Sequence, residues 1–488
     1  MTPKNLLILM SDEHNPKIMG CAGNDIVETP HIDALARRGT RFASAYTTCP
    51  ICVPARAAFA VGKYVHQIGY WDNADAYDGA IPSWHHLLRE RGHEVVSIGK
   101  LHFRGASVGG KQDDHGFSEE IVPMHIIDGI GDVKGLVREK IPVRKGGDKM
   151  SKLAGPGESP YTVYDRDIAS RAQIWLHEAS KKQHDKPWVL FVSFVAPHFP
   201  LTAPPEWYYK YIDRDLPWPK LYDKNERPHH PFTDDYTRVV DYDTHFKSAD
   251  DVKRAIAGYY GLVSATDQHI GNIVEALRVS GQDSDTRVLY TSDHGDNLGA
   301  RGLWGKSTFY EESAGVPLII AGEGIPAGIT RDAPASHVDV FPFVFDCVGE
   351  PMPHDPDLPG VSLTALAEGA DPDRGVISEY HATASTAGGF MLRDGNYKYV
   401  HYVAYRPQLF DLERDPEELT DVAADPAYAD VLARCRARMY EMFDPDEVDA
   451  RAKKRQAELL AKYGGREIAL ARGDLGFTPA PGTNAEID

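Results

Sequence analysis

The sequence predicts an α/β fold with a large, mostly parallel central sheet flanked by helices, followed by a smaller C-terminal α+β domain. Unbroken apolar runs, typical of strands buried on both faces, alternate with helical patterns over the first three quarters of the chain. Beyond residue 370 the pattern changes to short strands separated by Asp-Gly-type turns, followed by helices rich in Ala, Arg and Lys. We therefore predict two domains, 1–370 and 371–488.

The predicted strands and helices follow from the apolar patterns and from Pro and Gly at their ends. We expect strands at 5–10, 93–98, 188–195, 286–291 and 316–320, and in the second domain at 376–380, 389–393 and 397–402. We expect helices at 29–39, 81–91, 165–180 and 252–280, a helix start at 336–341, and helices at 427–443 and up to 463. The segments 104–161 and 201–247 are predicted as long excursions that shape a pocket.

Composition excludes several classes of protein. With 42% hydrophobic and 26% charged residues, the 488-residue chain is typical of a globular protein, and its net charge of −19 argues against nucleic-acid and anionic-membrane partners. The longest apolar run, 188–196, is too short to cross a bilayer, and no signal peptide is visible, so we expect a cytoplasmic protein. The five cysteines are few and scattered, so no disulfide framework is expected.

The stretch Cys49-Pro-Ile-Cys52-Val-Pro-Ala-Arg56 is the most informative motif. Pro54 suits the first turn of a helix, so Cys52 is expected at a helix N-terminus with Arg56 one turn further on. From the residues alone, the two cysteines could form a redox pair or half of a zinc site, although no second Cys-x-x-Cys exists. Cys52 could equally be a buried structural thiol.

Polar residues follow four of the predicted strands. Because ligands of open α/β sheets bind beyond the carboxyl ends of the strands, we expect these residues to meet at one rim. They are Asp12 with Glu13, Lys100 with His102, His198, and Asp293 with His294. Adjacent carboxylates there suit a hard cation, although Asp12 could also be a helix cap. Lys100 and His102 would share one face if their strand continued, the alternatives being a solvated lysine and a structural histidine.

Taken together, these motifs resemble the sulfatase family of the alkaline-phosphatase superfamily. The resemblance runs from Asn5 to about Leu419. It includes the Cys-x-Pro-x-Arg signature at Cys52, Lys306 in its Gly-rich loop, and the segment 409–416. Asp72-Asn73-Ala74 and the Asp293-His294 pair are similar to the branch that contains arylsulfatases, choline sulfatases and phosphonate monoester hydrolases. The resemblance implies an alkaline-phosphatase-like fold.

The resemblance also implies roles for individual residues. A formylglycine-generating enzyme would oxidise Cys52 to formylglycine, whose hydrate is the nucleophile. A divalent metal, calcium or alternatively manganese, would be bound by Asp12, Glu13, the modified Cys52, Asp293 and His294. Catalytic roles are implied for Cys52, Arg56, Asn73, Lys100, His102, His198 and Lys306.

The predicted activity is hydrolysis of small anionic sulfate monoesters, of aryl or small alkyl alcohols. The alternative is a phosphonate monoester or phosphodiester hydrolase using the same site. That branch has Tyr and Thr where this chain has Lys100 and His102, which favours the sulfatase. A hypothesis of another class is a non-catalytic anion-binding or redox protein with Cys52 as a free thiol. The extension after Phe443 has little core of its own, which predicts a homo-oligomer, a dimer or tetramer.

Overall fold

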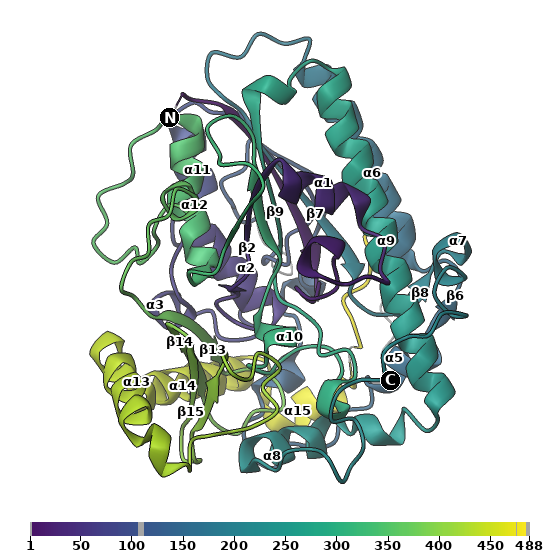
Figure 1. Cartoon of the computed structure of the whole chain (residues 1–488), viewed down its shortest axis with the longest axis vertical. Coiled ribbons are helices and arrows are strands. Elements are labelled where there is room, and N and C mark those ends of the chain that lie inside the picture. The colour runs from purple at the N-terminus through teal and green to yellow at the C-terminus, as the bar shows by residue number, and fades with distance from the viewer. Residues whose placement is uncertain (1, 106–111, 475, 485–488) are drawn as a thin grey trace.

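The computed structural model describes residues 2–105, 112–474 and 476–484. Its centre is an eight-stranded sheet covered by helices on both faces (Figure 1). In order across the sheet, the strands are β11 (Ile329–Arg331), β2 (Gly39–Phe42), β10 (Leu318–Ala321), β9 (Thr286–Ser292), β1 (Asn5–Asp12), β7 (Val189–Pro197), β4 (Val95–Lys100) and β5 (Glu119–Met124). Only the pairings of β10 with its two neighbours are antiparallel, so the predicted mostly parallel sheet is confirmed.

Strand β1 shows why the central strands read as continuous apolar runs. Leu6 and Ile8 pack into one hydrophobic cluster, while Leu7 and Leu9 pack into another on the opposite face. The first face is covered by α2 (Cys52–Val61), α4 (Trp84–Glu90) and α11 (Val340–Val348), and the second by α1 (Pro30–Arg37), α6 (Pro160–Ala179) and α9 (Ala249–Val279). With helices on both sides, every position of the strand from Leu6 to Asp12 is buried.

The four predicted polar strand ends lie next to one another. Strands β9, β1, β7 and β4 are consecutive in the sheet and parallel, so their carboxyl ends meet at one edge. Ser11 of β1 pairs with Ser292 of β9, the residue directly before Asp293. Asp12 of β1 pairs with Pro197 of β7, the residue directly before His198. The expectation of a common rim is confirmed.

A second sheet lies toward the C-terminus. It is antiparallel, in the order β13 (Val376–Tyr380), β14 (Gly389–Asp394), β15 (Tyr397–Tyr402) and β16 (Gln408–Asp411). It is followed by α13 (Ala429–Met442), α14 (Pro445–Lys462) and α15 (Gly465–Ala471), the last of which the sequence patterns did not predict. Apolar side chains of this sheet belong to the same cluster as α2 and α11. The domain boundary at residue 370 stays a prediction.

Shorter elements fill the connections. They are β3 (Ala45–Tyr46), α3 (Val65–Ile68), α5 (Asp148–Lys152), β6 (Gly155–Pro156), β8 (Thr202–Ala203), α7 (Pro205–Tyr208), α8 (Pro231–Val240), α10 (Glu311–Ala314), β12 (Ala335–Ser336) and α12 (Leu363–Ala367). Single 3-10 turns lie at Gly20–Ala22, Ile127–Gly129, Val133–Leu136, Tyr242–Thr244, Asp283–Asp285, Ala300–Gly302, His337–Asp339 and Pro426–Tyr428. No helix in the described ranges has the length and apolar character needed to span a bilayer.

Candidate active site

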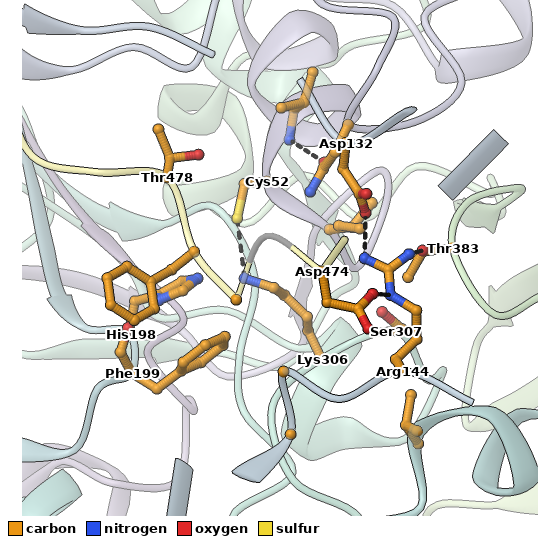
Figure 2. A pocket seen from close by; sticks show the side chains of 18 of the residues that line it. Cys52, Asp132, Arg144, His198, Phe199, Lys306, Ser307, Thr383, Asp474 and Thr478 are labelled. Carbon is orange, nitrogen blue, oxygen red and sulfur yellow. Dashed lines mark hydrogen bonds and ion pairs between the residues drawn. The ribbon is translucent and has the colours of Figure 1, made fainter. Parts of the chain in front are cut away.

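Cys52 is the first residue of α2, as the position of Pro54 predicts. The helix ends at Gly62, whose φ of 74° and close approach to Phe341 leave no room for a Cβ atom. Every residue of α2 is buried, so the Cys52 side chain is fixed by a rigid element. Its Sγ atom lies 3.1 Å from Lys306 Nζ, a contact that Figure 2 shows.

The metal-ligand candidates meet around Cys52. One ligand atom each from Asp12, Cys52, Asp293 and His294 lies within 4.8 Å of the others, and all four residues are buried. Cys52 Sγ is 3.2 Å from His294 Nε2 and 3.6 Å from Asp12 Oδ1. Two carboxylates and an imidazole at this spacing fit a divalent cation.

Glu13 lies beside these ligands. Its Oε2 atom is 3.2 Å from Lys306 Nζ and 3.3 Å from His198 Nε2, while its buried Oε1 atom has no hydrogen-bond partner among the described residues. Burial raises the pKa of Glu13 to about 8, because water is excluded from the carboxyl group. An unpaired oxygen here is the second observation that fits a cation at this site.

Arg56 holds the two aspartates in place. Its guanidinium donates to Asp293 Oδ2 at 2.8 Å and to Asp12 Oδ2 at 2.9 Å. It also donates to the Lys100 carbonyl at 2.8 Å and to Ser193 Oγ at 2.9 Å, so it joins four segments of the rim. The side chain is only 2% exposed. This planar fork cannot be reproduced by lysine.

Lys100 and His102 do not share a strand face. Strand β4 ends at Lys100, and His102 has a φ of 54°, which turns the chain away from the extended conformation. Lys100 Nζ therefore lies 2.6 Å from Asp12 Oδ2, whereas His102 Nε2 lies 3.0 Å from Thr478 Oγ1. Burial opposes ionisation of Asp12, but nearby cations, Lys100 first among them, hold its pKa well below the usual range.

His198 and Asn73 are placed by local backbone contacts. The His198 ring lies 2.6 Å from the Phe199 carbonyl through Nδ1, so that nitrogen carries the proton and Nε2 faces Glu13. Burial and Lys306 hold the pKa of His198 well below its usual value. Asn73 Oδ1 accepts the backbone N–H of Val53 at 3.3 Å, at the start of α2.

A pocket of about 170 Å³ opens beside Cys52 (Figure 2). The predicted site residues that line it are Cys52, Asn73, His102, His198 and Lys306. Apolar walls come from Met150, Phe199, Tyr236, Tyr242 and Phe477. The excursions 104–161 and 201–247 thus both contribute to the pocket, as expected.

Sequence reasoning missed the polar group opposite Cys52. Arg144 donates to Asp132 at 2.7 Å, pairs with Asp474 at 2.8 Å and donates to Thr383 Oγ1 at 3.0 Å (Figure 2). No local motif marks these residues, because they come from distant segments.

The C-terminal tail also lines the pocket, through Asp474, Gly476, Phe477 and Thr478. The sequence predicted only that the extension after Phe443 would pack against another surface. In the structure that surface belongs to the same chain. The predicted homo-oligomer stays a prediction.

The thiols show little sign of redox activation. Burial, with Asp12 adding to it, raises the pKa of Cys52 to about 12, and burial raises the pKa of Cys49 well above its usual value. Because the thiolate is the reactive form of cysteine, these environments disfavour the redox interpretation of the Cys-x-x-Cys spacing.

Comparisons with known proteins agree with this geometry. A family model described as Sulfatase matches residues 4–350, and one described as N-sulphoglucosamine sulphohydrolase, C-terminal, matches residues 299–444. Choline-sulfatase of Rhizobium meliloti (strain 1021) is 33% identical over 477 residues, which cover 94% of this chain and 90% of that protein. Arylsulfatase K of Rattus norvegicus is 29% identical over 448 residues, covering 86% and 75%.

Among solved structures, a phosphonate monoester hydrolase of Agrobacterium radiobacter superimposes with a TM-score of 0.71 at 22% identity. The match covers 97% of this chain and 98% of that one. At this identity the likeness concerns the fold, and it confirms the predicted α/β architecture.

Proposed function

Because the chain belongs to the sulfatase family, we propose that it hydrolyses sulfate monoesters of aryl or small alkyl alcohols in the pocket beside residue 52. The observation that carries this proposal is the convergence of Cys52 Sγ with Asp12, Asp293 and His294 at the rim of the sheet. That arrangement places one reactive position against a set of cation ligands and against Lys306.

Asp12, Asp293 and His294 would hold a divalent cation together with residue 52 and Glu13. When bound, such an ion polarises a sulfuryl oxygen and lowers the pKa of the attacking hydroxyl. The carboxylate-rich donor set favours calcium, and the nitrogen of His294 leaves manganese as the alternative.

Residue 52 would be formylglycine in the mature enzyme, formed by a formylglycine-generating enzyme. Its hydrate would supply one hydroxyl to attack sulfur, which expels the alcohol as the S–O ester bond breaks, and a second hydroxyl whose deprotonation would release sulfate and restore the aldehyde. The thiol itself is poorly suited to attack, since its pKa is raised to about 12.

The remaining residues position groups and move protons. Arg56 and Lys100 fix the two aspartates, and Asn73 caps the helix that carries residue 52. Lys306 Nζ, 3.1 Å from Cys52 Sγ, would neutralise charge on the transferring group. Lys306 would protonate the leaving oxygen, whereas His198, the other candidate, is a neutral ring whose proton on Nδ1 is held by the Phe199 carbonyl.

His102 would accept the proton that leaves residue 52 when sulfate is released. Burial and the neighbouring Lys100 hold its pKa well below the usual value, so the ring is neutral. Its Nδ1 atom is buried and has no partner in the part of the chain that the structure describes, while Nε2 is held by Thr478.

The test is the mass of the tryptic peptide 42–56, which contains both Cys49 and Cys52, from protein made with and without a formylglycine-generating enzyme. We expect the change from CH2SH to CHO at Cys52 alone, and aryl-sulfatase activity that rises with the modified fraction. The Cys49→Ser variant is the matched control and should stay active. Full activity of a protein in which Cys52 remains a thiol would refute the proposal.

Hydrolysis of phosphonate monoesters or phosphodiesters by the same site stays a prediction. Both substrate classes present a tetrahedral anion to the same groups. Comparing kcat/KM for matched aryl sulfates and aryl phosphonates on one preparation of enzyme measures the preference.

A further inference from the structure

A second cluster of potential metal ligands surrounds strand β5, and it shares no residue with the candidate active site. His115 precedes the strand, Glu120 lies on it and His125 follows it directly. One ligand atom from each of these three residues lies within 4.8 Å of the others. The side chain of His115 is fully buried, and those of Glu120 and His125 are 14% and 15% exposed.

The contacts of His115 require either a proton or a metal ion between its ring and Glu120. Its Nε2 atom lies 2.8 Å from the Arg104 carbonyl, which can only accept, so this nitrogen carries a proton. In a neutral ring the other nitrogen, Nδ1, then presents a lone pair, yet it lies 2.9 Å from Glu120 Oε1, a second acceptor. Either a proton lies between the two atoms, on the ring or on the carboxyl group, or a metal ion joins them.

His125 favours the metal ion. Both of its ring nitrogens are buried and lack a hydrogen-bond partner within the described ranges, as does Glu120 Oε2. His125 Nε2 lies 3.3 Å from Glu120 Oε2, close enough for an ion pair if the ring is protonated but outside good hydrogen-bond geometry. A second proton on His115 satisfies His115 and one oxygen of Glu120, but it gives none of these three atoms a hydrogen-bond partner among the described residues. Buried polar atoms without partners are rare, and an ion held by His125 Nε2 and Glu120 Oε2 would explain two of the three; His125 Nδ1 would still lack a partner among the described residues.

We propose that His115, Glu120 and His125 bind a divalent transition-metal ion of the zinc type. Two imidazole nitrogens and one carboxylate are ligands typical of zinc, with water in the fourth position. Zinc–ligand bonds of about 2.0–2.2 Å place tetrahedral ligand atoms roughly 3.4 Å apart. His115 Nδ1 lies 2.9 Å from Glu120 Oε1 and His125 Nε2 lies 3.3 Å from Glu120 Oε2, so each imidazole faces a different oxygen of the carboxylate, and the 3.3 Å separation is close to that value. The bond from His115 Nε2 to a carbonyl is the outer contact that orients a metal-bound histidine.

The ion would anchor the strand that supports one wall of the active-site pocket. Strand β5 lies at the edge of the sheet and pairs with β4. The carbonyl of Met124 accepts the backbone N–H groups of Leu101 and His102 at 3.1 and 2.8 Å. Ile126, the residue after His125, donates to the Phe103 carbonyl at 3.0 Å and lines the pocket. The site therefore has a structural role, and it positions the loop of His102 from behind.

The test is zinc binding by the full-length protein after dialysis against a chelator, measured as metal content per chain, and as an anomalous-scattering peak at the zinc edge in crystals. We expect one zinc ion between His115, Glu120 and His125. Glu120→Gln and His125→Asn should each lose one equivalent, and zinc should no longer raise their melting temperature.

Two control variants separate this site from others. His229, a histidine whose side chain is 86% exposed, is the matched control, and His229→Asn should keep the zinc. Asp293→Asn, which alters the candidate active-site metal ligands, should keep it too. Zinc content unchanged in Glu120→Gln and His125→Asn, or no anomalous peak at the cluster in the wild-type crystal, would overturn the proposal. His115 would then be a doubly protonated ring paired with Glu120.

Discussion

Removing the guanidinium of Arg56 should destabilise the chain more than any other single change at the rim. Arg56→Met keeps much of the side-chain length but deletes four hydrogen bonds, two of them to the buried carboxylates of Asp12 and Asp293. Breaking one buried ion pair costs about 3–5 kcal/mol, because the remaining charge is left uncompensated. With two carboxylates affected, we expect a loss near 5 kcal/mol in metal-free protein.

The structure also predicts which changes reduce that loss. In an Asp293→Asn background one of the two charges is absent, so Arg56→Met should cost less, by about 1.5–3 kcal/mol, the value of a hydrogen bond to a charged group. Saturating calcium should reduce the loss as well, because the ion compensates the same carboxylates. Arg56→Lys keeps the charge without the fork and should fall between wild type and Arg56→Met.

The assay is unfolding in guanidinium chloride, followed by tryptophan fluorescence with calcium or with a chelator. Stabilities are compared only among variants with the same m value, so that the change lies in stability and not in the unfolded state. A loss below about 1 kcal/mol for Arg56→Met, or strict additivity with Asp293→Asn, would refute the idea that Arg56 compensates these two carboxylates.

Three further changes test other parts of the site. Lys306→Met should lower kcat/KM for aryl sulfates about 10²–10³-fold, and more for poorer leaving groups, whereas Lys182→Met on the exposed surface should have no effect. No dependence on the leaving group would contradict a role at the leaving oxygen. Thr478→Val removes the hydrogen bond to His102 and should lower kcat about tenfold, the equivalent of roughly 1.4 kcal/mol. Thr478→Ser keeps the hydroxyl group and should keep the wild-type kcat. Equal kcat values for the two variants would contradict a role of this hydrogen bond in catalysis. Burial raises the pKa of Asp165 to about 7, whereas the pKa of an aspartate in an unfolded chain is about 3.9. Between pH 4 and 7 the folded chain therefore binds more protons than the unfolded chain, and the free energy of unfolding falls as pH rises. Asp165→Asn should flatten that slope in melting temperatures measured across this range, and an unchanged slope would show that other groups cause it.

The rim of the sheet could be predicted because its signals are local. A parallel strand buried on both faces leaves an unbroken apolar run, and Asp12, Lys100, His198 and Asp293 each lie at or directly after the end of such a run. Parallel pairing then brings the four ends together without any knowledge of side-chain contacts. The position of Cys52 could be predicted equally well, because a proline two residues later marks the start of its helix.

The part of the pocket lined by Arg144, Asp474 and Thr478 could not be predicted, because it depends on contacts between distant segments. His102 meets Thr478, 376 residues further along the chain, and Arg144 meets Asp474. Neither contact leaves a spacing pattern. The direction of His102 also depends on its positive φ, which is unusual for a residue other than glycine and carries no sequence signal here.

The charges at the rim explain how a chain with a net charge of −19 could attract an anionic ester. Long-range attraction is unfavourable, so the substrate must be held by groups in contact with it. Yet above a pH of about 8, where Glu13 is ionised, the nearest charged side chains are balanced, with three carboxylates and three cations: Asp12, Glu13 and Asp293, with Arg56, Lys100 and Lys306. A divalent ion bound there would give the site a net positive charge. At such a pH, metal binding and substrate binding should therefore be coupled, and the anion should bind weakly to the metal-free site even though every side chain that contacts it is in place.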